Sequence, residues 1–233
     1  MYLPDAFRQD DPALLAAAIR GCGLGVLVTL GDDGLVASHV PMLLDPDPAP
    51  FGTLRGHLAA PNPQAQGVAQ GGAQGVAALA IFTGPDGYIT PSWYETKRRT
   101  GAVVPTWNYI AVHAYGPIAF FADADRLRDI VTRLTERHEA ARAEPWAVTD
   151  APPAFIDGML RGIVGFEIPI ARLEGKWKLS QNRPPADRAG VVAGLEQDGA
   201  ATLAAAVAAP VAAPVAAPVA APVAAPVAAT KRG

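Results

Sequence analysis

Val104-Pro105-Thr106-Trp107-Asn108-Tyr109-Ile110-Ala111-Val112-His113-Ala114-Tyr115 is the stretch that decides the fold. In an extended strand, side chains alternate between two faces, so the even-numbered residues 108–114 share one face and the odd-numbered residues 107–115 share the other. The even face is largely apolar and predicts a core. The odd face is aromatic and contains His113, which suits a cofactor wall or a subunit interface, with ordinary aromatic packing as the alternative.

Further strands are predicted on both sides of this stretch. A Gly31-Asp32-Asp33-Gly34 turn between two apolar runs predicts a β-hairpin. Residues 107–121 form either one long strand or a hairpin that breaks at Gly116-Pro117. The remaining strands are short, β-branched or alternating segments, and the full set of strands besides 107–121 is 24–30, 35–44, 51–58, 76–82, 163–170 and 176–180. Residues 64–75 are a weak helix or a loop.

Few helices accompany these strands. Asp11-Pro12 begins one, because Asp is a good N-cap and Pro suits the first helical position. Asp123 caps a second, which has helical apolar spacing to about Arg142, and Pro152-Pro153 opens a third through Leu160. Many short strands in hairpin order with few helices predict a mainly β fold, an antiparallel barrel with peripheral helices.

The chain divides into a folded domain, residues 1–197, and an Ala/Pro/Val-rich low-complexity tail, residues 198–233. From about Ala204 the tail repeats Ala-Ala-Pro-Val, and a proline at every fourth residue opposes a helix. The tail also lacks large side chains that could anchor it. It is therefore predicted to be disordered and polyproline-like.

Composition excludes some classes of protein and argues against others, DNA-binding proteins among them. The net charge of −3 provides no basic field for DNA, and the single Cys22 excludes an intramolecular disulfide and a cysteine-based zinc site. The four histidines show no metal-ligand spacing, and neither a Gly-x-Ser-x-Gly elbow nor a Walker loop occurs. No apolar run is long enough for a membrane span, and the N-terminus does not read as a signal peptide, so a cytoplasmic location is expected.

Polar side chains gather in a predicted loop, Thr83 to Val104, which contains Ser92, Trp93 and Lys97. So long a loop is either a binding loop or a surface loop that its aromatics hold down. Arg55-Gly56-His57 offers a guanidinium beside a flexible glycine, although most strand arginines are simply solvated. The run from Gly175 to Pro184 is either a polar strand end or one half of a cofactor pocket.

Taken together, these strings resemble the PaiB-like family, described as FMN-binding negative transcriptional regulators and related to flavin-binding split barrels of the pyridoxamine-phosphate-oxidase type. The resemblance spans nearly all of the folded domain. The matching segments are Met1-Tyr2-x-Pro4, Ser38-His39-x-Pro41, Leu54-Arg55-Gly56-His57-Leu58-Ala59, Asn62-Pro63, Phe82-x-Gly84-Pro85, Tyr88-Ile89-Thr90-Pro91-Ser92-Trp93-Tyr94, Lys97, Val104-Pro105-Thr106-Trp107-Asn108-Tyr109, Gly165-Phe166-Glu167-Ile168 and Lys178-Leu179-Ser180-Gln181-Asn182-Arg183. The chain departs from the family at Ala60, where an Arg is usual.

The resemblance implies an FMN-binding split β-barrel that forms a homodimer, with the flavin at the subunit interface. It assigns the phosphate and ribityl contacts to Arg55, His57, Lys97 and Thr106. Aromatic walls are expected from Trp93, Trp107 and Tyr109. Hydrogen bonds to the ring edge are expected from Ser38, His39, Asn62, Asn108 and Gln181, and the set is completed by Ser92 and Lys178.

The resemblance implies a family role in negative transcriptional control. The alternative is a flavin-dependent oxidoreductase, an NAD(P)H-linked reductase or an oxidase, of unknown substrate. For that activity the spacing shows no dedicated catalytic residue, and His57 and His113 are the reasonable acid–base candidates. A repressor that binds DNA without flavin is the third hypothesis, which the charge balance and the lack of a helix-turn-helix pattern do not support.

Overall fold

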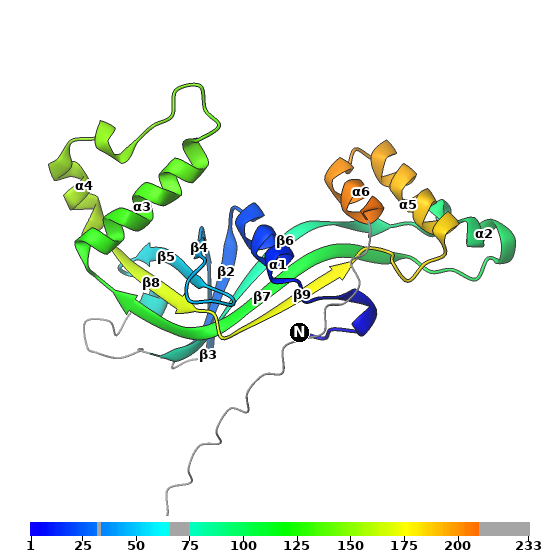
Figure 1. Ribbon diagram of the computed structural model, residues 1–233, viewed down its shortest axis with the longest axis horizontal. Coiled ribbons are helices and arrows are strands. Elements are labelled where there is room, and N and C mark those ends of the chain that lie inside the picture. Colours follow the sequence, from blue (N-terminus) through cyan, green and yellow to red (C-terminus); the bar gives the residue numbers. More distant parts are fainter. Residues whose placement is uncertain (32–33, 66–74, 210–233) are drawn as a thin grey trace, which may run out of the picture.

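A computed structural model of the chain describes residues 1–31, 34–65 and 75–209. Its centre is a nine-stranded sheet in which every strand pair is antiparallel (Figure 1). The order is β3-β2-β6-β7-β8-β5-β4, while β9 pairs with β7 and with β1. The strands are β1 (Arg8–Gln9), β2 (Gly25–Gly31), β3 (Gly34–Val40), β4 (Leu43–Asp45), β5 (Thr53–Ala59), β6 (Val76–Ile89), β7 (Thr106–Phe121), β8 (Ile163–Pro169) and β9 (Arg172–Lys178). The predicted mainly β architecture with peripheral helices is confirmed.

The two end strands of the sheet order, β3 and β4, are consecutive in the chain, and their short connection brings the edges of the sheet together as a barrel. The predicted strand 35–44 is divided at Pro41-Met42 into β3 and β4, so these residues join the two ends of the sheet order. The barrel interior contains fully buried Leu27, Leu54 and Phe166. Gly56 permits this packing, since a Cβ atom at that position would lie 2.6 Å from Cζ of Phe166.

Three strands, β6, β7 and β9, extend past the barrel as an arm (Figure 1). β7 is one strand through Gly116-Pro117, which confirms the long-strand alternative. The prediction of a loop over Thr83–Val104 is wrong, because β6 continues to Ile89 and is followed by the 3-10 turn η4 (Pro91–Trp93) and by α2 (Glu95–Thr100). A register shift between Thr83 and Asp86 lets β6 pass Gly84-Pro85 and resume pairing with β7.

The predicted helices occur with their predicted caps. In α1 (Pro12–Gly21), Oδ1 of Asp11 accepts the backbone N–H of Ala13 at 2.8 Å. In α3 (Ala124–Glu139), Oδ1 of Asp123 accepts that of Arg126 at 2.9 Å, although the helix ends at Glu139 rather than near Arg142. Helix α3 and α4 (Pro153–Leu160) form a separate apolar cluster with Leu43 of β4 and Phe121 of β7. These helices therefore cover the β4–β5–β8 side of the barrel.

The C-terminal part differs from the prediction. Helices α5 (Pro185–Gln197) and α6 (Ala201–Ala208) cover one face of the arm (Figure 1). Residues 198–209 are thus not a disordered tail, since Leu203 and Val207 of α6 are buried against the arm. The repeat from 210 onward lies outside the described residues, as do 66–74 of the segment predicted to be a weak helix or loop. Within the described residues, no helix is both long and apolar enough to cross a membrane.

Candidate functional site

Helices α5 and α6 leave the other face of the arm free (Figure 1). We call it the open face and define it by Tyr88, Trp107, Tyr109, Lys176 and Lys178, of which Lys176 is covered by Tyr2. Strand register brings these residues together, because Trp107 lies opposite Tyr88, and Tyr109 lies opposite Lys178. The Trp107 indole is 50% exposed, donates to Oδ1 of Asp86 at 2.8 Å and meets the Tyr88 ring edge-on at 6.3 Å. The open face therefore combines fixed aromatic surfaces with cations.

The two lysines of the open face have no carboxylate partner among the described residues. Lys176 is buried, and its Nζ donates to the backbone oxygen of Tyr2 at 3.0 Å and lies 5.4 Å from the ring centres of Tyr2 and Tyr109. Nζ of Lys178 donates to Oγ1 of Thr106 and to the backbone oxygen of Trp107. Burial, and then the charges of Lys176 and Arg183, lower the pKa of Lys178. An anion bound here would relieve that repulsion.

The opposite face of the arm is internal. Asn108 is fully buried, and its Nδ2 donates to Oγ of Ser180 at 2.9 Å while its Oδ1 is unpartnered among the described atoms. Ser180 has a φ of 59°, a left-handed conformation that is uncommon for residues other than glycine. The turn it makes places Gln181 so that its Oε1 accepts the backbone N–H of Leu179 at 2.7 Å. Asn108 and Gln181 thus support the end of β9 from inside.

Trp93 is not part of the open face. Its indole packs against α5 so closely that a Cβ atom on Gly194 would lie 2.2 Å from Cε2 of the ring. Ser92 and Lys97 are exposed beside it, and Nζ of Lys97 donates to Oγ of Ser92 at 3.0 Å. The structure therefore makes Trp93 an anchor for this segment, while Ser92 and Lys97 present polar groups at its surface.

A second polar group lies at the rim of the barrel, where β3 ends. Nδ2 of Asn62 donates to Oγ of Ser38 at 2.9 Å, and Oδ1 of Asn62 accepts the backbone N–H of Gln64 at 2.9 Å. His39 is exposed on the other face of β3, and Ala60 is exposed in the turn after β5. Asn62 is therefore committed to ordering this rim, and the imidazole of His39 is open to solvent.

His57 of β5 lines an open hollow of about 350 Å³ between the barrel and α3. Its Nδ1 is buried and has no hydrogen-bond partner among the described residues, and burial lowers the pKa of His57. The imidazole is accordingly neutral at pH 7, with one nitrogen able to donate and the other to accept. The other lining residues are Pro41, Val131, Leu134, Thr135, His138, Glu139 and Trp146.

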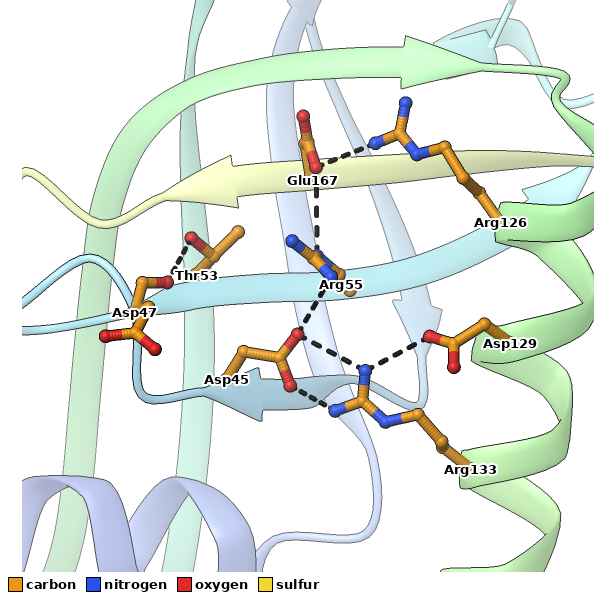
Figure 2. Close-up of polar contacts among 8 residues, drawn as sticks. All are labelled: Asp45, Asp47, Thr53, Arg55, Arg126, Asp129, Arg133 and Glu167. Atoms are coloured by element: carbon orange, nitrogen blue, oxygen red, sulfur yellow. Dashed lines mark hydrogen bonds and ion pairs between the residues drawn. The ribbon is translucent and has the colours of Figure 1, made fainter.

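Arg55 precedes this hollow on the same face of β5, but its guanidinium is engaged (Figure 2). Nη1 of Arg55 lies 3.1 Å from Oδ2 of Asp45, and its Nε lies 3.7 Å from Oε2 of Glu167. Asp45 also pairs with Arg133 of α3, and Glu167 pairs with Arg126 of α3 at 2.8 Å. The network ties α3 to the barrel. The Arg55 guanidinium, which the sequence predicts as a phosphate contact, is already paired with Asp45 and Glu167.

The structure thus divides the residues that the sequence predicts for one site. Thr106, Trp107, Tyr109 and Lys178 come together on the arm, whereas Ser38, His39, Asn62 and His57 lie at the rim and on β5. Lys176 lies in the Gly175–Pro184 run that the sequence predicts as a possible half of a cofactor pocket, but it was not singled out, although strand alternation places it on the same face as Lys178. Sequence reasoning missed Trp146 and Thr135, for which no local motif gave a signal. No cluster of three or more His, Cys, Asp or Glu suited to a metal ion occurs in the described part of the chain.

Comparison with known proteins adds sequence relatives. A family model described as "Putative FMN-binding domain" matches residues 1–172. An uncharacterized protein of Aspergillus fumigatus is 37% identical, over 85% of this chain and 92% of its own length. Protease synthase and sporulation protein PAI 2 of Bacillus subtilis is 31% identical, over 85% of this chain and 90% of its own length.

Solved structures agree on the fold. A conserved hypothetical protein of Mycobacterium tuberculosis superposes with a TM-score of 0.53 at 14% identity, covering 79% of this chain and 94% of that protein. An FAD and heme binding protein of Mycobacterium smegmatis gives a TM-score of 0.53 at 17% identity, covering 73% of each chain. At such identities the likeness concerns the fold, and it confirms the predicted split barrel.

Proposed function

The chain belongs to the PaiB-like family of FMN-binding domains, and we propose that two copies of it build each FMN site together, the hollow beside β5 and α3 coming from one copy and the open face from the other. The observation that carries the proposal is the division of the predicted site. In one chain the hollow beside β5 and α3 and the open face of the arm lie at opposite ends of the molecule (Figure 1).

Each half offers what FMN needs and lacks what the other half has. The hollow has a volume within the range of ligand sites and an unpartnered His57 nitrogen, and Trp146 supplies an aromatic wall that is 46% exposed. The open face has Lys176 and Lys178 with no carboxylate partner in the described residues, beside Tyr109 and Trp107. A flat ring and a phosphate match these donors.

An uncovered apolar surface supports self-association. Leu30 and Leu35 at the end of the β2–β3 hairpin are 66% and 78% exposed, and strand register continues the same face through Val28 to Leu79. A contiguous apolar sheet face is a typical interaction surface. A two-fold contact through this face would bury it on both copies at once and form a homodimer.

The residues of the chain bind and orient the cofactor, and FMN when bound supplies electron-transfer chemistry. Neutral His57 can donate one hydrogen bond and accept one, and it can hold or pass a proton at its buried Nδ1. Lys178 and Thr106 form a joined pair that would face phosphate oxygens. Tyr109, flanked by the Lys176 ammonium, would exclude water from one side of the ring.

Mixed dimers test the shared site. His57→Ala removes the contact from the hollow and Lys178→Ala removes the contact from the open face, so each variant alone is expected to bind FMN weakly in a fluorescence titration. After the variants are mixed and re-associated, about a quarter of the sites are wild type, since half of random dimers are mixed and each of those has one intact site. Recovery of tight binding near that fraction supports the proposal, whereas no recovery shows that both residues serve a site within one chain.

The oxidoreductase alternative also rests on His57. A half-buried neutral imidazole facing a hollow is a reasonable proton donor or acceptor beside a redox cofactor. NAD(P)H consumption by the FMN-loaded protein with a panel of acceptors tests it. Turnover that His57→Gln lowers at least tenfold, without loss of FMN, supports this role, and absence of turnover leaves FMN binding as the function.

The transcriptional role of the family has one local feature in its favour. Helix α2 exposes Lys97, Arg98 and Arg99 at the far end of the arm, on a chain whose net charge is negative. Consecutive cations can contact phosphates of DNA, and such binding weakens steeply with salt. A gel shift on promoter DNA, compared with the Arg98→Gln/Arg99→Gln double variant at two salt concentrations, tests this role. Binding that the double variant leaves unchanged contradicts it.

A further inference from the structure

Helix α2 is too short to be stable by itself, and its first turn lacks a cap of its own. It spans Glu95–Thr100, and its N-cap residue, Tyr94, makes no side-chain capping bond. The cap comes instead from α5, where Oδ1 of Asp187 accepts the backbone N–H of Thr96 at 2.8 Å. A residue far along the chain therefore does what an N-cap side chain ordinarily does for its own helix.

The carboxylate of Asp187 is buried, and its hydrogen bond to the Thr96 amide is directed at α2. Its side chain is 1% exposed, and its Oδ2 has no partner among the described atoms. Burial acts to raise the pKa of Asp187, but the Thr96 hydrogen bonds and the charge of Arg183 outweigh it, so that the pKa lies below its ordinary value. A buried carboxylate that stays ionised is stabilised by what it contacts. The hydrogen bonds from α2 and the charge of Arg183 together keep the buried carboxylate ionised.

The neighbouring contacts hold α5 and the start of α2 in one arrangement. Tyr94 is fully buried, and the Arg183 guanidinium lies 4.7 Å from the centre of its ring. Gly190 of α5 packs against the backbone of Trp93, the residue before Tyr94. A Cβ atom added to Gly190 would lie 2.0 Å from the Trp93 carbonyl oxygen. Only a glycine lets α5 approach this backbone so closely. Tyr94, Trp93 and Asp187 therefore link α5 rigidly to the Ser92–Lys97 segment.

We propose that Asp187 is a positioning residue for FMN binding: from α5, beyond the residues that match the family model, it fixes α2 so that Ser92 and Lys97 are presented to the phosphate end of the cofactor. This inference rests on the proposed function, FMN binding, and on the sequence prediction that Ser92 and Lys97 are FMN contacts. Asp187 itself is buried behind α2 and contacts no cofactor. It acts by keeping Lys97 and Ser92 in one geometry, 3.0 Å apart.

The test compares Asp187→Ala with Asp187→Asn in the full chain. Alanine removes the acceptor, whereas the asparagine side-chain oxygen can still accept the Thr96 N–H. Asp198→Ala, an exposed change at the end of the same helix, is the control. Two quantities are measured: the rate of tryptic cleavage after Lys97, Arg98 and Arg99, and the dissociation constant of FMN from a fluorescence titration.

We expect Asp187→Ala to be cleaved about fivefold to tenfold faster, the effect of losing a helix cap, and to bind FMN weaker by a similar factor. Asp187→Asn and Asp198→Ala should remain within about twofold of the unmodified chain in both measurements. Equal behaviour of Asp187→Ala and the control overturns the proposal. So does equal weakening by alanine and asparagine, because a general loss of packing would not distinguish them.

Lys97→Ala separates this inference from the proposed function. Faster cleavage of Asp187→Ala, with FMN affinity unchanged in both Asp187→Ala and Lys97→Ala, would show that Asp187 fixes α2 but that this segment does not contact FMN. If Asp187→Ala fails to fold, hydrogen exchange at the Thr96 amide of the unmodified chain gives the answer. Slow exchange supports the cap, and exchange at the rate of an unstructured peptide overturns it.

Discussion

Replacing Gly190 of α5 by alanine is a sharp test of how the C-terminal helices pack. Helix propensity alone would make the alanine variant more stable by about 1 kcal/mol. At this position, however, the new Cβ atom would lie 2.0 Å from the carbonyl oxygen of Trp93, and backbone cannot turn away as a side chain can. Relief requires α5 to move by roughly 1 Å, and overpacking of this kind costs about 1–3 kcal/mol. Because the obstacle is backbone, we expect the upper part of that range and a net loss of roughly 2 kcal/mol.

Gly158→Ala in α4 is the matched control. There the nearest atom to a new Cβ is Nη2 of Arg161 at 3.6 Å, an ordinary contact, so only the propensity gain remains. Thermal unfolding followed by circular dichroism should therefore show Gly190→Ala lower by about 4–8 °C and Gly158→Ala equal to or above the unmodified chain. If the two variants shift the midpoint alike, α5 does not pack on the Trp93 backbone, and the account of the arm fails.

Other predictions address the ion-pair network, the hollow and the rim. Asp45→Asn leaves Arg133 without its main partner and should lower the free energy of unfolding in urea by about 1–2 kcal/mol, a range that allows for the partial exposure of the pair. Asp157→Asn, which breaks the exposed pair with Arg128, should lower it by less than about 0.5 kcal/mol. Burial holds the pKa of His57 below its ordinary 6.5, so the unfolded chain takes up a proton first and stability should fall as pH drops below about 6.5. His57→Gln should remove that part of the pH dependence, and an unchanged profile would contradict it. Ala60→Arg should tighten FMN binding about fivefold at low salt and less at high salt, whereas Ala60→Gln should not; equal effects would exclude a charge contact.

Much of the barrel follows from local sequence. The Gly31-Asp32-Asp33-Gly34 turn predicts the β2–β3 pairing, and the structure pairs Gly31 with Gly34. Alternation in β7 correctly separates buried Asn108 from exposed Trp107. These succeed because one face of a strand is buried by the sheet itself, whatever the rest of the chain does.

The arm and its helices were harder to predict because their causes are not local. Gly84-Pro85 is typical of a turn, yet β6 accommodates it with a register shift since β7 continues alongside. Gly190 and Gly194 weaken any helical pattern in α5, and their reason is the Trp93 side chain and backbone against which they pack. In α6 the repeat composition conceals a stretch without proline from Ala201 to Ala209. The absence of proline over these residues was the signal for a helix, and the proline-containing repeat that follows obscured it.

Residue type alone predicted one site where the structure shows two separate groups of residues. Cations and aromatics were grouped because FMN needs both, but one chain holds them apart. Burial and the charges of Lys176 and Arg183 lower the pKa of Lys178, which has no carboxylate partner of its own among the described residues. Such repulsion is a cost to the unliganded fold that an anionic ligand removes. Lys178→Met should therefore raise the thermal midpoint of the FMN-free protein while weakening FMN binding about tenfold or more, the effect of losing one charge-assisted hydrogen bond. The opposite signs are the diagnostic result. A variant that loses stability and affinity together would mean that Lys178 supports the strand end through Thr106 and Trp107, and that the arm is a scaffold rather than a phosphate site.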